Sequence, residues 1–199
     1  MDIKSEKLDT GDYKEVAKLH CEYINQGFLA TLGIPFLTLL YEAIDQDNES
    51  VLLVERVDKN IIGFITGTKG LGKIYKQLLL RPHRLIYSLK SCFLSPSKLY
   101  KILEVLFISS GTNIPAYLPK QELLSIVVDS SYQGKSHAEN LFKALCNHFS
   151  HQGVSNFKIV VGSNLNRAHA FYTKMGAYPS KEIQVHKGVN SIVYIKYLE

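Results

Sequence analysis

Apolar and polar positions recur along the chain with two different periods, which together predict an α/β fold. Runs rich in β-branched and apolar residues predict strands at 3–8, 51–57, 61–66, 123–128, 157–161, 183–185 and 191–197. Helical spacing predicts helices after a cap at Asp12, from Pro35, over 138–149 and over 167–175. Gly153 and Gly176 mark helix ends. The order predicts a mixed sheet covered by helices.

The segment from about 67 to 121 interrupts this order. Apolar residues at helical spacing are separated there by Pro82, Pro96 and Pro115. This pattern predicts two or three helices inserted between two strands of one sheet. A length of 199 residues is typical of one domain, so we expect a single domain over 1–199 that carries a helical insertion.

Composition indicates in which cellular compartment the protein works. The N-terminus is polar and charged, and no apolar run approaches the roughly 18 residues of a membrane span, so we expect neither a signal peptide nor a span. Cys21, Cys92 and Cys146 lie far apart without metal-ligand spacing. Reduced thiols and no metal site are expected, which indicates a cytoplasmic protein.

Charge is concentrated in the insertion. Between Lys69 and Leu103 there are eight basic residues and no acid, whereas the rest of the chain carries 15 basic and 18 acidic residues. Three interpretations remain open: a solvated helical face, a lid over an anionic or lipid-linked substrate, or a membrane or nucleic-acid surface. Aromatic residues at helical spacing favour core packing over nucleic-acid contacts, so no nucleic-acid partner is expected.

The segment from 123 to 151 carries the main chemical signal. An apolar strand feeds the polar, glycine-containing turn 130–136, and the turn opens a helix. The first N–H groups of a helix lack internal acceptors and, with the helix dipole, form a site for an anion. Small residues at Gly134, Ser136 and Ala138 let a diphosphate approach the backbone, and Lys135 adds positive charge. The turn therefore predicts a phosphorylated ligand.

Two motifs resemble the GNAT (Gcn5-related) N-acetyltransferase family. The family's turn for acetyl-CoA reads Gln/Arg-x-x-Gly-x-Gly/Ala, and this chain has Gln133-Gly134-Lys135-Ser136-His137-Ala138, with Ser136 in place of the middle glycine. Downstream, the family's helix motif is matched by Ala168, Phe171, Tyr172, Lys174 and Gly176. Leu165 stands where the family's asparagine usually falls, between Asn164 and Asn166.

The resemblance implies a GNAT-like, mostly antiparallel mixed sheet whose fourth and fifth strands splay apart, flanked by helices. It implies an acetyl-CoA-dependent N-acetyltransferase in which a primary amine attacks the thioester directly. The backbone of Ile126, Val127 and Val128 would hold the pantetheine. The turn residues, including Lys135 and His137, would hold the diphosphate, with Asn164 or Asn166 nearby. Tyr172 would protonate the departing thiolate, and a phenol stays protonated in use because its pKa is about 10.

The acceptor side is less determined. An attacking amine must lose a proton, and Glu122 is the first candidate base, because bases in the family often lie on that strand. His137 and His169 are alternatives. The acceptor is expected to be a small-molecule amine, with an anionic one favoured if the basic stretch contacts it. Its pocket is expected between the break at Gly27 and Gly33 and the inserted helices.

Two other functions fit parts of the sequence. The run from Gly67 to Lys73 is similar to a phosphate-binding GxxxxGK[ST] loop, but Ile74 occupies the position of the hydroxyl that would bind Mg²⁺. A glycine-rich exit from a strand explains that run better. The departures at Ser136 and Leu165 also leave open a GNAT-like domain that binds acyl-CoA as a sensor or interaction domain without catalysis.

Overall fold

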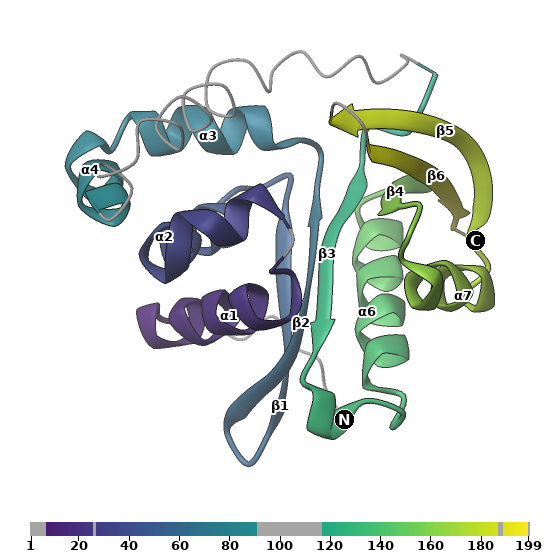
Figure 1. The fold of residues 1–199 in the computed structure, drawn as a ribbon, viewed down its shortest axis with the longest axis horizontal. Helices are drawn as coiled ribbons and strands as arrows, with labels where there is room; N and C mark the ends of the chain where they lie inside the picture. Colours follow the sequence, from purple (N-terminus) through teal and green to yellow (C-terminus); the bar gives the residue numbers. More distant parts are fainter. Residues whose placement is uncertain (1–6, 26, 91–116, 187–188, 199) are drawn as a thin grey trace.

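The computed structural model describes residues 7–25, 27–90, 117–186 and 189–198, and these build one six-stranded sheet flanked by helices (Figure 1). The strands lie in the order β1-β2-β3-β4-β6-β5, and every neighbouring pair is antiparallel except β3 and β4. Their bounds are β1 Val51–Val57, β2 Asn60–Thr68, β3 Glu122–Val128, β4 Asn156–Gly162, β5 Tyr178–His186 and β6 Val189–Tyr197. The predicted mixed, mostly antiparallel sheet is confirmed.

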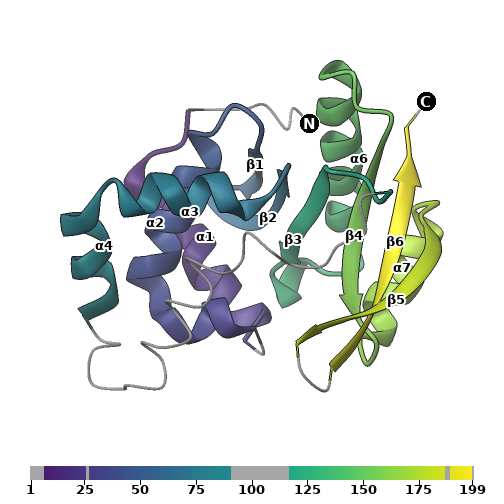
Figure 2. The ribbon, with the colours of Figure 1, turned by 90° about the horizontal axis from the view of Figure 1, so that it is seen from above.

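Helices cover both faces of this sheet (Figures 1 and 2). One side carries α1 Thr10–Tyr23, the 3₁₀ helix η1 Phe28–Leu32, α2 Gly33–Asp45, α3 Leu71–Leu79 and α4 Pro82–Leu89. The other side carries α6 His137–His151 and α7 Asn166–Lys174, and the short 3₁₀ helix η5 Ser130–Tyr132 precedes α6. A separate hydrophobic core fills each side, so the sheet is buried on both faces.

Helix α6 is held by its apolar face. Leu141, Phe142, Leu145 and Phe149 are buried, at the spacing that places them on one side of a helix. Gly67 lets this face approach β2 closely, because a Cβ there would lie 2.5 Å from Cζ of Phe149. This contact fixes α6 against β2. Because β2 pairs with β3, the start of α6 lies beside the end of β3.

Two local predictions are tested at the N-terminal side. The cap of α1 is Asp9, not Asp12: Asp12 occupies the third helical position and completes a reciprocal capping box with Asp9. The hairpin between β1 and β2 is confirmed, and Asp58 and Lys59 turn it with positive φ angles of 50° and 70°. The predicted strand at 3–8 lies almost entirely outside the described residues.

The described part of the insertion, α3 and α4, packs into the core beside α1 and α2. Ile74, Tyr75, Leu78 and Leu85 are all members of that core. Pro82 begins α4, where its missing N–H costs nothing. The predicted helical segment around 99–106, together with Cys92, Lys98 and Lys101, lies outside the described residues.

One stretch contradicts the expectation that no apolar run is long enough to span a membrane. Phe28–Asp45 is long and apolar enough, by length and composition, to cross a membrane, with a mean hydropathy of 1.4. Half of it is buried inside the fold, and α2 supplies core residues such as Phe36, Leu40 and Ile44. A core helix passes the same test, so the finding is weak evidence for a membrane.

Candidate active site

Strands β3 and β4 separate soon after they begin. Their parallel ladder has two pairs, Glu122 with Lys158 and Leu123 with Ile159, although β3 continues for five more residues and β4 for three. A bulge lies at this point, because Ser125 faces Thr66 and Leu123 faces Gly67 on β2, which leaves Leu124 without a partner. A bulge bends its strand, so the splay has a local cause in β3 itself.

The open end of this splay leads into the turn 129–136. Asp129 accepts a hydrogen bond from the Ser131 N–H at 2.8 Å, and its own N–H donates to the Ile62 carbonyl, also at 2.8 Å. Gln133 donates from Nε2 to the Val128 carbonyl at 3.1 Å. The side chain of Gln133 thus joins the turn to the end of β3 and fixes the position at which the chain enters α6.

The backbone from 134 to 139 offers a row of unused donors. Within the part of the chain that the structure describes, no acceptor pairs with the N–H groups of these six residues, and the first bond into the helix is from Asn140 to the Ser136 carbonyl at 2.9 Å. Gly134 has φ +77°, and no atom lies within 4 Å of where its Cβ would be. The turn therefore offers open backbone with unused donors, which is what the prediction of an anion site requires.

Ser136 departs from the family's glycine but adopts a glycine-like conformation. Its φ of 63° and ψ of 6° are left-handed, and its hydroxyl makes no capping bond to α6. A left-handed residue with a side chain is uncommon and costly, which explains why glycine suits this position. Ser136 therefore holds a backbone conformation that glycine adopts without strain.

His137 ties the beginning of α6 to the edge strand β1. Its Nδ1 lies 2.6 Å from Oε1 of Glu55, whose side chain is 4% exposed. Its ring packs edge-on against Tyr132, with centroids 6.0 Å apart. Lys135 lies over the same Tyr132 ring, at 5.4 Å from the centroid, and donates to the Ser131 carbonyl. Aromatic packing therefore braces the turn from within.

Tyr172 projects from α7 into an aromatic cluster. Its ring lies 5.3 Å from that of Phe171 and 6.2 Å from those of Phe142 and Tyr194. The residue is 6% exposed, and burial raises the pKa of its phenol above the ordinary value. Its hydroxyl has no hydrogen-bond partner among the described residues. A rigidly held phenol with an unused donor is suited to a ligand in the adjacent splay.

The start of α7 carries the displaced asparagines. Leu165 is the capping residue, makes no side-chain cap and is 45% exposed, while Asn164 and Asn166 flank it on the surface. Oδ1 of Asn164 lies near Gly162 at the end of β4, since a Cβ there would be 3.2 Å away. Asn164 is therefore on the β4 side of the splay, and Asn166 is on the first turn of the helix.

Glu122 lies at the closed end of the splay and is paired. Its Oε2 is 3.3 Å from Nζ of Lys158, a buried lysine that also donates to the carbonyls of Pro119 and Lys120. Burial raises the pKa of Glu122, and the Lys158 ammonium opposes that shift. Lys158 thus joins the predicted base to the segment that returns from the insertion.

The two histidine alternatives are both engaged. Nδ1 of His169 lies 3.0 Å from the Tyr194 hydroxyl and Nε2 lies 3.1 Å from the Gly162 carbonyl, so both ring nitrogens serve to join α7 to the sheet. One nitrogen of His137 contacts Glu55. His169 therefore has both ring nitrogens engaged, whereas His137 keeps Nε2 without a partner among the described residues.

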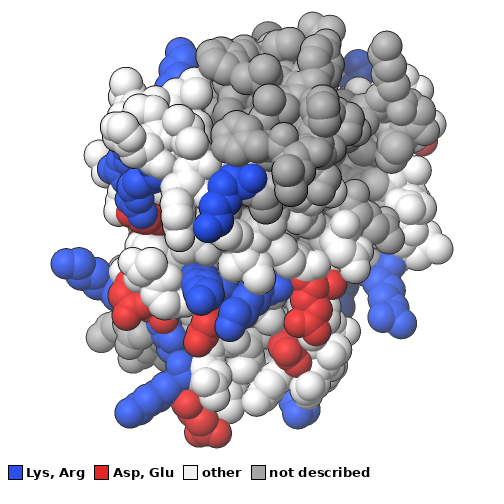
Figure 3. Space-filling model, turned by 60° about the vertical axis from the view of Figure 1, so that its left-hand side comes forward, with Lys and Arg blue, Asp and Glu red and all other residues white. Residues whose placement is uncertain are grey.

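The described basic residues of the insertion are largely neutralised by acids on and after α2. Arg84 binds both carboxylate oxygens of Glu42, Arg81 lies 3.8 Å from Glu42, and Lys73 lies 2.8 Å from Asp47. Lys69 pairs with Glu49. Figure 3 accordingly shows Lys and Arg interspersed with Asp and Glu on this side. The pairs favour the structural interpretation of the described part of the basic stretch.

The same pairs bear on the phosphate-loop alternative. Gly72 and Lys73 lie within α3, not in a loop ahead of a helix, and Lys73 is bound to two carboxylates. No group of three or more metal-binding side chains occurs among the residues that the structure describes. The glycine-rich exit from β2 is the interpretation that fits.

Comparisons with known proteins decide the fold family. Residues 115–198 match the profile of the Acetyltransferase (GNAT) domain. The chain has the GNAT fold. The resemblance found in the two motifs is thereby confirmed, and the matched range contains β3, the turn, α6 and α7. No curated protein matches this sequence.

Solved GNAT structures superpose over nearly the whole chain. An N-acetyltransferase from Staphylococcus aureus Mu50 is 13% identical with a TM-score of 0.62, covering 96% of each chain. An aminoglycoside 6'-N-acetyltransferase complexed with coenzyme A is 12% identical with a TM-score of 0.63, covering 99% of this chain and 97% of the other. The PaiA N-acetyltransferase from Thermoplasma acidophilum, in complex with coenzyme A, is 15% identical with a TM-score of 0.59, covering 99% of both.

Sequence reasoning missed several residues around the GNAT turn. Glu55, Lys158 and the bulged Leu124 were not singled out, and Tyr23 was not either, although its hydroxyl accepts from the Ser130 N–H at 3.1 Å. A charged residue within an apolar strand was the available signal for Glu55 and Lys158. Nothing in the local sequence marks the bulge or the Tyr23 contact.

Proposed function

We propose that this protein transfers an acetyl group from acetyl-CoA to a primary amine of a small molecule. The observation that carries the proposal is the splay of β3 from β4, which opens directly onto six unused backbone N–H groups. The diphosphate would lie on the N–H groups of 134–139, with Lys135 beside it. The pantetheine would follow the backbone of Ile126, Val127 and Val128, which pair only with β2. Coenzyme A complexes of two structural neighbours support the choice of ligand.

The acceptor amine would attack the thioester carbon directly, and the C–S bond would break to release the CoA thiolate. Tyr172 would donate a hydrogen bond to that thiolate. The raised pKa of the phenol makes complete proton transfer uphill, because a thiol has a pKa of about 8.5. The hydroxyl therefore acts first as a neutral donor to developing charge, which is the kind of group that lowers a barrier in a water-poor site.

The amine must reach the carbon unprotonated, and Glu122 is our proposed base. Its raised pKa makes this carboxylate a stronger base than an ordinary glutamate. Asn164 and Asn166 would contact the cofactor from the other side of the splay. The acceptor would enter between η1 and the inserted helices. An anionic acceptor would need basic residues other than those already paired with acids.

We further propose one domain over 1–199 in the cytoplasm, where Cys21 and Cys146 stay reduced.

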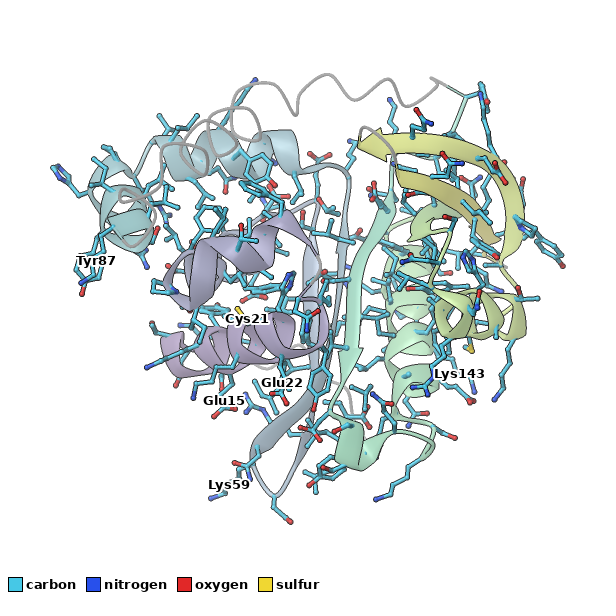
Figure 4. The ribbon with its side chains drawn as sticks, in the orientation of Figure 1. Glu15, Cys21, Glu22, Lys59, Tyr87 and Lys143 are labelled. Atoms are coloured by element: carbon cyan, nitrogen blue, oxygen red, sulfur yellow. The ribbon has the colours of Figure 1, made fainter. Side chains whose placement is uncertain are left out.

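Calorimetry with acetyl-CoA tests the cofactor assignment. We expect micromolar binding by the full chain, and absence of binding at millimolar cofactor would contradict it. Lys135→Glu should weaken binding about 10-fold, since it reverses a charge beside the diphosphate. Lys143→Glu is the matched control, because Lys143 is an exposed lysine farther along α6 (Figure 4) and should leave affinity unchanged.

Turnover separates the enzyme from the sensor. CoA release, followed with a thiol reagent over a panel of aminoglycosides, polyamines, amino sugars and peptides, should identify an acceptor. Binding of acetyl-CoA without release over the whole panel would instead favour a non-catalytic acyl-CoA-binding domain.

A further inference from the structure

Glu55 is a buried carboxylate with no evident reason to be in the core. It lies on β1 among apolar strand residues and is 4% exposed. Its Oε1 contacts Nδ1 of His137 at 2.6 Å, and its Oε2 is buried with no partner among the described residues. A buried acceptor left unpaired costs free energy, and a well-packed apolar pair is commonly at least as stable as a buried ionic one. Fold stability alone does not explain this arrangement.

The contact between Glu55 and His137 lies at the strained junction between the turn and α6. His137 is the first residue of α6 and follows Ser136, whose left-handed backbone is strained. The Tyr132 ring braces the His137 ring from the far end of the turn. One side chain from β1 therefore fixes the residue on which the direction of the unused N–H groups depends.

The orientation of the imidazole follows from the same contact. The two ring nitrogens point in different directions, so Nδ1 on Glu55 turns Nε2 away from the core. Nε2 of His137 has no partner within the described chain and is not among the fully buried orphan atoms. The contact with Glu55 therefore fixes the orientation of the ring at the first residue of α6.

We propose that Glu55 is a positioning residue for the diphosphate of the cofactor and acts through His137. The carboxylate holds the ring, and with it the first residue of α6, so that the N–H groups of 134–139 stay directed at one anion. This inference rests on the proposed function, since it concerns the same ligand site. It adds a residue on β1 that lies outside the cofactor motif in sequence, 82 positions before its partner.

The test compares Glu55→Met with Glu55→Gln in the full chain, using acetyl-CoA as the probe. Methionine removes the contact while it fills the space, and should weaken acetyl-CoA binding and raise its KM about 10-fold, with kcat at saturation within about 2-fold. Glutamine still offers an oxygen to Nδ1–H and should stay within about 3-fold of the wild type. Glu22→Gln is the matched control, because Glu22 is an exposed glutamate on α1, outside the proposed cofactor site, and its replacement should leave acetyl-CoA binding unchanged.

A double-variant cycle separates this role from a structural one. If Glu55 acts through His137, Glu55→Met should add less than about 2-fold to the loss caused by His137→Asn. A lowered melting temperature with an unchanged dissociation constant for acetyl-CoA would overturn the inference. If Glu55→Met does not fold, His137→Asn alone must weaken binding about 10-fold, and unchanged binding would overturn it. Failure of the wild type to bind acetyl-CoA would instead contradict the proposed function.

Discussion

The Nδ1 atom of His20, on α1, lies 2.5 Å from the hydroxyl of Tyr41, on α2, and both residues are buried. The other ring nitrogen of His20 is buried and has no partner among the described residues. Burial lowers the pKa of His20 to about 4 from its ordinary 6.5. This pair joins the two helices that cover the proposed acceptor side, and it makes their packing sensitive to acid.

We expect the stability of the protein to fall as the pH drops from 6.5 to 4. In that window the unfolded chain binds a proton at residue 20 and the folded chain does not, so each step toward acid favours unfolding. The shift corresponds to about 3 kcal/mol lost by pH 4. Urea unfolding at several pH values measures it. His20→Gln should remove about this much of the pH dependence, whereas His151→Gln, at an exposed histidine, should not. Parallel curves for the wild type and His20→Gln would refute the assignment.

Ser136→Gly should stabilise the protein by about 0.5–1 kcal/mol, because glycine adopts the left-handed conformation without the penalty that a side chain incurs. No cap is lost, since the Ser136 hydroxyl makes no bond to α6. Chemical denaturation measures the difference, and Ser136→Ala is the control because it keeps the Cβ and should give no gain. A glycine variant less stable than the alanine variant would show that the turn is not strained.

The parts of this fold that the sequence predicted are those governed by neighbours along the chain. The strand, turn and helix at 123–151 and the helix ending at Gly176 follow from periodicity and turn chemistry, and two short motifs led to Tyr172. The unpredicted parts depend on distant residues. Glu42 neutralises Arg84 across 42 positions, and Glu55 meets His137 across 82. A basic run read alone therefore suggested a positive surface that the folded acids largely cancel.

The role of Glu122 has a kinetic signature. Glu122→Gln should lower kcat about 100-fold if the carboxylate removes the amine proton, and should leave acetyl-CoA affinity within about 2-fold. The acidic limb of the pH–rate profile should disappear with it. Lys158→Met keeps the carboxyl group and removes the ammonium that lowers its pKa, so the acidic limb should move to higher pH. An unchanged profile in both variants would remove Glu122 from the mechanism.

Tyr172→Phe separates chemistry from binding and from folding at one position. The phenol has no hydrogen-bond partner among the described residues, so its loss should leave the stability of the protein unchanged or slightly raised. The aromatic contacts with Phe171, Phe142 and Tyr194 are kept by phenylalanine. Acetyl-CoA affinity should therefore stay within about 2-fold, while kcat falls about 100-fold as the thiolate loses its donor. Steady-state kinetics with calorimetry on the same preparation measures both, and Phe171→Leu serves as a control for altered packing. A thiolate that leaves easily needs less stabilisation by a donor. The loss of kcat should therefore be smaller for an acyl donor whose thiol has a lower pKa than that of CoA. Equal losses of kcat for both donors, or no loss for either, would place Tyr172 outside the chemical step.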